Sequence, residues 1–415
     1  MSRERPESVS DGGAWVQVPL SALYEFKNGV NADRRAYGQG IPFINVLEPI
    51  TFSHLQGREI SGRVDLPDAA VAAYEVRNGD LVFNRTSEIG EEVGLAAAYL
   101  GTERVVFGGF VIRARPVSAM IDANFAAYAM RASDVRSQII AMGQGAVRAN
   151  IGQENLRRVE LKLPPLPEQL AIAKALIDAD ALIDSLEQLL TKKRQIKQGA
   201  MDELFTQRRR LPGHSNPWAE AHIGDFTDCT AGGTPSTRVE SYWGGAIPWM
   251  SSGDLHLKRV DAVDGRITEN GLNNSSTKWI LPRCVLIGLA GQGKTRGTVA
   301  MNLIPLCTNQ SIAAIFPSDT YDSEFLYHNL DWRYEDLREL STGDGGRGGL
   351  NLTLIRSIKV PKPCLAEQKA ISQVLSDIDS EITALYSRLA KARALKQAMA
   401  QALLTGRIRL VEPAA

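Results

Sequence analysis

A long internal repeat constrains this sequence more than any other feature. When residues 166–211 are placed over residues 365–410, a shift of 199 positions without gaps, about 20 of the 46 positions are identical. Glu168 and Gln169, for example, recur as Glu367 and Gln368. A period of this length is too long for a solenoid repeat. The chain is therefore predicted to be an internal duplication of one unit that has two parts.

The segments between the repeated blocks match each other more loosely, so the order is variable segment, block, variable segment, block. Proline-rich joints stand near each boundary, as expected between folded elements. The polar N-terminal stretch lacks the apolar core of a signal peptide. We expect a disordered leader at 1–13, variable domains at 14–163 and 212–360, and helical segments at 164–211 and 361–410.

The repeated blocks predict two helices of roughly 40 residues, because neither contains an internal proline and both fit a heptad pattern. An apolar seam of this kind needs a partner helix. We favour an antiparallel pair within the chain over a parallel contact between two copies. The predicted seam residues, also the candidates for partner docking, are Leu176, Ile183, Leu186 and Leu190 in the first block and Leu375, Ile382, Leu385 and Leu389 in the second.

The variable segments predict mixed α/β domains. Short apolar runs bounded by turn residues are typical of strands, and longer amphipathic runs are typical of helices. The expected strands are 41–47, 80–84, 104–114, 283–289 and 311–316, and the expected helices are 124–142 and 322–340. The fold class is therefore α/β (α+β): two globular domains separated by two long antiparallel coiled-coil helices, with an internal pseudo-twofold repeat.

A phosphate-loop pattern occurs at 288–295, where Gly-x-x-x-x-Gly-Lys-Thr follows an apolar strand. Such a loop must lead into a helix whose amides hold the phosphates, yet Arg296 is followed by glycine and β-branched residues that favour a strand. We therefore predict a loop between strands rather than a nucleotide site. Its Gln292, Lys294 and Arg296 are suited to phosphates and base edges.

Two glycine-rich stretches precede the repeated blocks, and each carries one arginine, Arg148 and Arg347. A simple hinge, a nucleic-acid contact and a docking loop all remain open for these stretches. Arg85 occupies the position in the first variable segment that aligns with the phosphate-loop pattern of the second.

Catalytic and metal-binding patterns are missing from the sequence. It contains no amide-methyltransferase, HExxH, GxSxG or CxxC motif, and neither its five histidines nor its four cysteines have ligand spacing. No apolar run reaches the length needed to span a bilayer. We therefore expect a non-catalytic cytoplasmic protein with free thiols, without a metal or a cofactor of its own.

The charge balance bears on nucleic-acid binding, because 47 basic and 47 acidic residues give a net charge of zero. A net charge of zero argues against a surface covered in basic residues, which is the simplest electrostatic sign of a DNA-binding protein. The variable segments carry a small negative net charge and the repeated blocks a small positive one. Any DNA contact would therefore depend on localised loops.

These features together resemble the specificity subunits of type I restriction–modification systems. The resemblance covers the chain after the leader and rests on the two helical blocks opening at 163–176 and 360–375, with weaker support from the motifs at 247–255 and 291–297. It implies two target-recognition domains, each reading one half of a bipartite site in double-stranded DNA. The helices would set the spacing and dock two methyltransferase subunits.

The resemblance also implies that S-adenosylmethionine, ATP and magnesium belong to partner subunits, namely the methyltransferase subunits and the motor and endonuclease subunits. The candidate DNA-contacting residues are Arg85, Arg148, Gln292, Lys294, Arg296 and Arg347. The alternatives are a coiled-coil scaffold without DNA contact and, less in keeping with the sequence, a phosphate-loop NTPase.

Overall fold

The computed structural model describes residues 14–145, 148–291, 295–340 and 349–410. Contacts divide the chain into two compact units. The first unit joins the N-terminal 186 residues to the C-terminal segment that starts at Arg388, and the second unit comprises Glu187–Ser387. The first unit is therefore discontinuous in sequence, and the second is inserted into it. The expected leader lies outside the described residues.

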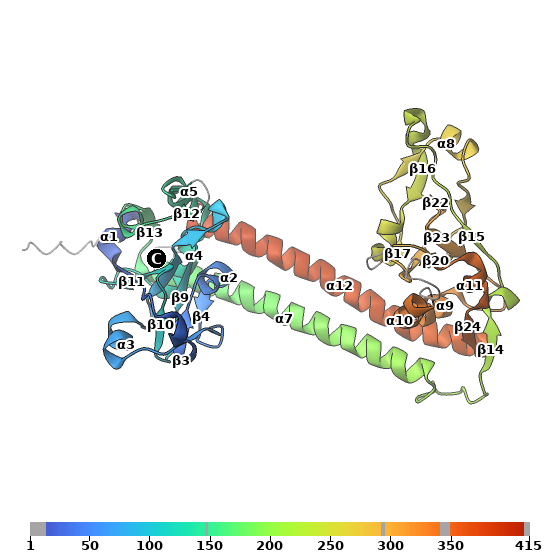
Figure 1. Ribbon diagram of the computed structural model, residues 1–415, viewed down its shortest axis with the longest axis horizontal. Helices are drawn as coiled ribbons and strands as arrows, with labels where there is room; N and C mark the ends of the chain where they lie inside the picture. The colour runs from blue at the N-terminus through green and yellow to red at the C-terminus, as the bar shows by residue number, and fades with distance from the viewer. Residues whose placement is uncertain (1–13, 146–147, 292–294, 341–348, 411–415) are drawn as a thin grey trace, which may run out of the picture. The chain divides into compact units, whose positions relative to one another are not determined.

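The described residues of the first unit form two main sheets and two small two-stranded sheets, whose strands are labelled in part in Figure 1. The five-stranded sheet has the order β2 (Tyr24–Asn28), β11 (Val111–Pro116), β7 (Leu81–Asn84), β9 (Ala96–Tyr99) and β4 (His54–Leu55). The four-stranded sheet has the order β5 (Arg63–Val64), β3 (Tyr37–Ile44), β10 (Val105–Phe107) and β6 (Glu75–Val76). The small sheets pair β1 (Val16–Pro19) with β13 (Glu160–Leu163) and β8 (Thr86–Ser87) with β12 (Ala149–Asn150).

The core of the first unit lies between the five-stranded sheet and the helices on one of its faces. Phe83 and Ile112 of the sheet and Phe125 of α4 are fully buried in this core, as is Leu176 of α7. The helices of the unit are α1 (Leu20–Leu23), α2 (Leu47–Thr51), α3 (Asp68–Tyr74), α4 (Ala123–Ala129), α5 (Ser133–Ala141), α6 (Gln153–Arg157), the first half of α7 (Leu166–Phe205) and the last part of α12 (Leu365–Leu404), with 3₁₀ turns at Arg34–Ala36 and Gly90–Glu92.

The second unit repeats the two main sheets and the β1–β13 pair of the first (Figure 1), and its described residues form no counterpart of the β8–β12 pair. Its five-stranded sheet has the order β15 (Cys229–Ala231), β23 (Ile312–Ile315), β20 (Val285–Gly288), β21 (Val299–Asn302) and β17 (Arg259–Val260). Its four-stranded sheet has the order β18 (Arg266–Ile267), β16 (Trp243–Met250), β22 (Leu306–Thr308) and β19 (Trp279–Ile280), and β14 (Ala219–His222) pairs with β24 (Lys359–Lys362). The helices are α8 (Glu269–Asn273), α9 (Ser323–Trp332), α10 (Tyr334–Glu339), α11 (Leu352–Ser357) and parts of α7 and α12 (Leu365–Leu404), with 3₁₀ turns at Ile223–Asp225, Glu240–Tyr242 and Ser252–Leu257.

The expected strand at 104–114 is wrong as a single element. The structure has β10 and β11, which lie in different sheets, with Gly108 and Gly109 between them. A Cβ atom on Gly108 would lie 2.5 Å from the ring of Phe43, and one on Gly109 would lie 1.9 Å from Oδ1 of Asn31. The two glycines therefore allow the close approach at which the chain passes from one sheet to the other.

The expected helices at 124–142 and 322–340 are each broken in two. In the first unit, Ala132 has an extended backbone and separates α4 from α5. In the second unit, Arg333 separates α9 from α10. Asp122 and Asp322 cap the first helix of each pair, because each carboxylate accepts a hydrogen bond from the backbone N–H three residues later.

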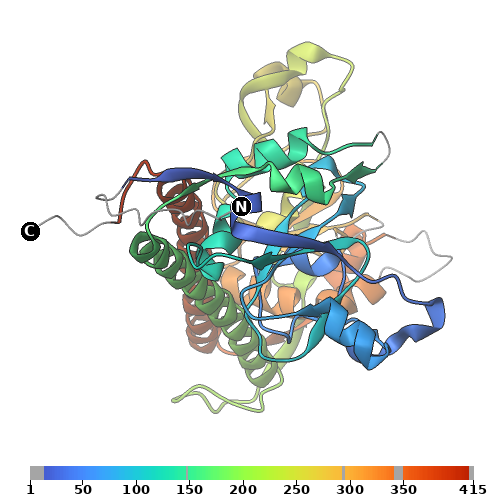
Figure 2. The same ribbon diagram turned by 90° about the vertical axis from the view of Figure 1, so that its left-hand side faces the viewer.

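The two long helices, α7 and α12, confirm the prediction of an antiparallel pair inside the chain. In the first unit, Leu403 of α12 is buried in the same core as Ile172 of α7, and in the second unit, Leu204 of α7 is buried with Ile371 of α12 (Figures 1 and 2). The start of each helix thus lies beside the end of the other.

The repeated Glu-Gln dipeptide anchors the start of each long helix in its own unit. Gln169 accepts a hydrogen bond from the backbone N–H of Asp122 (2.9 Å), and Gln368 accepts the equivalent bond from Asp322 (2.7 Å). Both glutamine side chains are fully buried and also donate to backbone carbonyls. These bonds fix the start of α7 to α4 and the start of α12 to α9.

The preceding glutamate of each dipeptide forms an ion pair with an arginine. Glu168 accepts two hydrogen bonds from Arg409, both 2.7 Å long, and one from the indole N–H of Trp15. In the second unit, Glu367 accepts equivalent bonds from Arg210 and Trp218. We call each of these groups a glutamate clasp. In the first unit, the clasp fastens both ends of the described chain to the start of α7.

Among the described residues, no helix combines the length and the apolar character needed to cross a bilayer.

Candidate nucleic-acid interface

The first unit brings together the chain segments that carry two of the candidate arginines. Arg85 follows β7, and Arg148 directly precedes β12, which pairs antiparallel with β8. The backbone N–H of Ile151 donates to the carbonyl of Arg85 (3.0 Å), so the chain after the first glycine-rich stretch is held against the end of β7. The candidate loops, distant in sequence, thus form one surface. We call β8, β12 and the adjoining Glu88 and Arg148 the first-unit ribbon.

Arg85 and Arg148 differ in their surroundings. The guanidinium of Arg85 is half-buried and donates to the carbonyl of Gly109 (3.3 Å), which fixes it against the β10–β11 turn. Arg148 is exposed and donates to Oε1 of Glu88 (2.6 Å). Arg148 is therefore the better placed of the two to contact a ligand directly, whereas Arg85 supports the loop beside it.

A cavity of about 390 Å³ lies beside the first-unit ribbon. Val46 and Ile50 line it together with Ile89 and Phe110, whose exposed fractions are 54% and 57%. The sequence analysis missed Glu88, Ile89 and Phe110 as candidates, because a lone glutamate and single apolar residues carry no motif. Only the β8–β12 pairing brings Glu88 and Ile89 next to Arg148.

In the second unit, the structure confirms that the phosphate-loop pattern lies between strands. β20 and β21 pair antiparallel, and Arg296 lies in the turn that leads into β21, so no helix follows the described part of this loop. Arg296 is half-buried. Gln292, Lys294 and Arg347 lie outside the described residues.

The second unit repeats the contact that joins the loops of the first. The backbone N–H of Leu350 donates to the carbonyl of Leu289 (3.0 Å), at the position equivalent to the Ile151–Arg85 bond. The chain after the second glycine-rich stretch therefore passes the end of β20, just as its counterpart passes the end of β7. Each unit thus presents the same pair of loops at the end of the middle strand of its five-stranded sheet.

The seam residues of the long helices are turned inward. Leu176 and Leu375 are fully buried, Ile382 is half-buried, and Ile183, Leu186, Leu190, Leu385 and Leu389 are between 5% and 9% exposed. They stabilise the chain's own fold, so they are not available to dock a partner as the sequence analysis expected. The same helices carry other apolar residues that are exposed, including Leu170 (51%) and Leu182 (48%).

Each unit also holds a polar cluster between its domain and the helix pair. In the first unit, the hydroxyl of Tyr128 donates to Asp180 (2.7 Å), which forms an ion pair with Lys396. Burial, together with this hydrogen bond, raises the pKa of Tyr128. The bond orients the ring of Tyr128 beneath the Lys396 ammonium group.

In the second unit, His328 takes the place of Tyr128, and Asp379 forms an ion pair with Lys197 (2.7 Å). His328 is fully buried, and its Nδ1 lies 4.0 Å from Asp379. Burial, with added repulsion from Lys197 and Arg259, lowers the pKa of His328 to about 2, so the ring is neutral. No local sequence pattern marks this histidine, because its neighbours Ser376 and Asp379 lie on another element.

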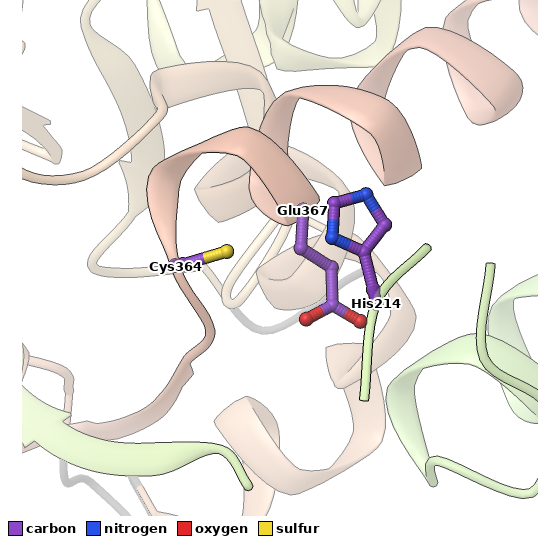
Figure 3. A group of neighbouring side chains, drawn as sticks. All are labelled: His214, Cys364 and Glu367. Atoms are coloured by element: carbon purple, nitrogen blue, oxygen red, sulfur yellow. The ribbon is translucent and has the colours of Figure 1, made fainter. Parts of the chain in front are cut away.

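One group of side chains among the described residues has the geometry to be considered as a metal site. Atoms of His214, Cys364 and Glu367 lie within 4.8 Å of one another (Figure 3). Both oxygens of Glu367, however, already accept hydrogen bonds from Arg210, and one also accepts from Trp218. Because the guanidinium repels a cation and occupies the carboxylate, Glu367 serves the glutamate clasp and the group does not fit a metal ion.

Comparison with known proteins decides the family. A sequence model of the type I restriction modification DNA specificity domain matches residues 70–198 and 215–391, about three quarters of the chain. The chain belongs to this family. It is a DNA specificity subunit of a type I restriction–modification system, with two target recognition domains and no catalytic role of its own.

Relatives and solved structures agree with this family. The putative specificity subunit of type I restriction enzyme MjaX from Methanocaldococcus jannaschii is 24% identical over 413 residues, 95% of this chain and 94% of the relative. The EcoR124I/EcoR124II specificity subunit of Escherichia coli is 27% identical over 178 residues, 42% of this chain and 44% of the relative.

Two solved structures share the fold. The S subunit of a type I restriction–modification system from M. genitalium has a TM-score of 0.59 at 18% identity, covering 96% of this chain and 98% of the other. A chain from a study of type I complex assembly and conformational transition has a TM-score of 0.56 at 16% identity, covering 95% and 98%. At these identities, the likeness concerns the fold alone.

Proposed function

We propose that each unit of this specificity subunit reads one half of a bipartite site in double-stranded DNA. It does so through the loops at the end of the middle strand of its five-stranded sheet. The observation that carries the proposal is the repeated pair of loops, in which Ile151 meets Arg85 and Leu350 meets Leu289. The same five-stranded topology presents these loops in both units. Two DNA-contacting surfaces with the same topology can each bind one half of a two-part site.

The candidate contacts are Arg85, Arg148, Gln292, Lys294, Arg296 and Arg347. Arginine and lysine recognise guanine edges and phosphates, and glutamine recognises adenine. In the first unit, Arg148 contacts DNA and Arg85 holds the neighbouring turn. This division of roles follows from the exposure of Arg148 and from the bond between Arg85 and Gly109.

The long helices dock two methyltransferase subunits through their exposed faces and set the spacer between the half-sites. The exposed apolar residues of α7, such as Leu170, Ile177 and Leu182 in the first unit, support this role. S-adenosylmethionine, ATP and magnesium bind to the methyltransferase and the motor and endonuclease subunits. The assembled complex acts on DNA in the cytoplasm.

Methylation by the assembled complex tests the proposal. Replacing Lys294 and Arg296 together by alanine is expected to weaken recognition of one half-site and to leave the other unchanged. Sequencing of the methylated sites in a DNA library measures both half-sites in one experiment. Unchanged recognition by the double variant would refute the role of this loop. A wild-type complex that assembles but shows no sequence preference would instead favour a scaffold without DNA contact.

A further inference from the structure

The ion pair between Glu88 and Arg148 stands at the exposed tip of the first-unit ribbon. The guanidinium donates to Oε1 of Glu88 over 2.6 Å, and the exposed fractions of the two side chains are 72% for Glu88 and 60% for Arg148. An ion pair as exposed as this one contributes about 0–1 kcal/mol to stability. The fold therefore does not depend on it, and both groups are accessible to a ligand.

The rest of the ribbon holds this pair in place. The hydroxyl of Thr86 donates to Oδ1 of Asn150 (2.5 Å), and the amide of Asn150 donates to the carbonyl of Arg148 (3.2 Å). Both ends of the Asn150 amide are thus used within the ribbon. Glu88 and Arg148 are left as the charged groups at its tip, beside exposed Ile89.

The chemistry of the pair fits a base edge better than a phosphate. A lone arginine suits either, but the neighbouring carboxylate of Glu88 repels phosphate oxygens. In the major groove, arginine donates to O6 and N7 of guanine, and glutamate accepts from N4 of cytosine. Since N4 and O6 of a paired cytosine and guanine are hydrogen-bonded to each other, they lie only ~3 Å apart. Two adjoining side chains of opposite charge match that arrangement.

The shape of the ribbon and its neighbours agree with this chemistry. The major groove admits a two-stranded β-ribbon, and β8 and β12 form one. Ile89 and Phe110 are exposed apolar residues on the cavity that Glu88 and Arg148 also line. A DNA surface seated on these apolar side chains would exclude water around the contact, which strengthens hydrogen bonds to a base edge.

We infer that Glu88 and Arg148 act together as the reader of a single G·C base pair in the half-site of the first unit. Arg148 binds the guanine and Glu88 binds the cytosine of the same pair. The ion pair between the two side chains is then replaced by hydrogen bonds from Arg148 to guanine and from cytosine to Glu88. This inference rests on the proposed function, in which the first unit contacts DNA through this ribbon.

The test uses the full-length subunit assembled with its methyltransferase partners and a double-stranded DNA library randomised across both half-sites. Sequencing of the methylated fraction gives the base preference at every position. Arg148→Ala is expected to lower the preference for guanine at one position by about 10-fold or more. Glu88→Ala is expected to relax the same position, and the half-site read by the second unit serves as an internal reference.

A matched control comes from the second unit. Glu220 and Lys359 form an exposed cross-strand ion pair (2.8 Å) with exposed fractions of 66% and 61%, on β14 and β24. Glu220→Ala and Lys359→Ala are expected to leave the motif unchanged. Thermal unfolding of all four variants establishes that each is folded.

Three outcomes would overturn the inference: an unchanged motif in both ribbon variants, relaxation at two different positions, or a uniform loss of affinity at all positions, as expected for a phosphate contact. These outcomes leave the proposed function intact, because the wild-type complex still shows a sequence preference. A wild-type complex without any preference would contradict the proposed function itself.

Discussion

Tyr128 and His328 occupy equivalent positions in the two units but interact differently with the helix pair. The hydroxyl of Tyr128 donates to Asp180, whereas Nδ1 of His328 lies 4.0 Å from Asp379. The neutral histidine is also close to Lys197 and Arg259, and its Nε2 lies within hydrogen-bond distance of the hydroxyl of Ser376 (3.2 Å). At this position the second unit therefore has a histidine, whose ordinary pKa is 6.5, where the first unit has a tyrosine, whose ordinary pKa is 10.0.

This difference predicts a pH dependence of the second unit. The pKa of His328 is lowered from 6.5 to about 2 in the folded protein, so the unfolded chain binds more protons below pH 6.5. The stability associated with the neutral ring is complete above that pH and is lost on acidification, with a slope approaching about 1.4 kcal/mol per pH unit. In urea unfolding between pH 4.5 and 8, His328→Gln is expected to show a shallower acid loss than wild type. Parallel curves would contradict the prediction.

At the scale of single residues, sequence reasoning located part of the candidate site. The glycine-rich stretch and the aligned loop led to Arg148 and Arg85, which the structure brings onto one surface. Glu88 could not be found in this way. Its importance depends on the register of β8 against β12, and nothing local in the sequence encodes that register.

At the scale of elements, the long helices were the most predictable part of the fold. Their heptad pattern continues for 40 residues, and the structure has α7 and α12 at that length. The helices at 124–142 and 322–340 were predicted as single elements, because the breaks at Ala132 and Arg333 involve neither proline nor glycine. Tertiary packing imposes those breaks, so propensity alone could not reveal them.

The two faces of α7 give contrasting predictions for truncation. Leu176 is fully buried in the core of the first unit, so Leu176→Ala is expected to lower the free energy of unfolding by about 3 kcal/mol. Leu170 lies on the same helix with half of its surface exposed, and Leu170→Ala is expected to change stability by about 0.5 kcal/mol or less. Denaturant unfolding of both variants measures the contrast. Equal losses of unfolding free energy in the two variants would contradict the prediction, because they would mean that Leu170 is as well covered as Leu176.

The glutamate clasps predict a destabilisation confined to one unit at a time. Burial alone raises the pKa of Glu168, but hydrogen bonds from Arg409 and Trp15 outweigh it, and the net shift is downward. The ionised carboxylate is thus held by its partners. Glu168→Ala removes the hydrogen bonds that Arg409 and Trp15 donate to this carboxylate and is expected to cost about 2 kcal/mol.

Hydrogen exchange with mass spectrometry locates this effect. Glu168→Ala is expected to lower protection of β1 and α4 in the first unit, and Glu367→Ala to do the same for β14 and α9 in the second. Each variant is the control for the other. Equal loss of protection in both units would contradict the assignment of one clasp to each unit.

At the scale of the whole molecule, charge predicts weak DNA binding by the chain alone. The net charge is zero and the variable segments are slightly acidic, whereas phosphate neutralisation supplies much of the affinity of DNA-binding proteins. Titration of labelled target DNA is expected to show little binding by the isolated subunit at physiological salt and tight binding after methyltransferase subunits are added. Strong specific binding by the isolated subunit would contradict this prediction.

The division of the chain into units also has a consequence for its synthesis. The second unit is complete once Ser387 has been made, but the first requires the segment from Arg388 onward, including the Arg409 that pairs with Glu168. At 5–20 residues per second, roughly 10–40 s pass between the two parts of the first unit. The second unit can therefore be completed before the first, which acquires the ion pair between Glu168 and Arg409 only after the segment from Arg388 onward has been synthesised.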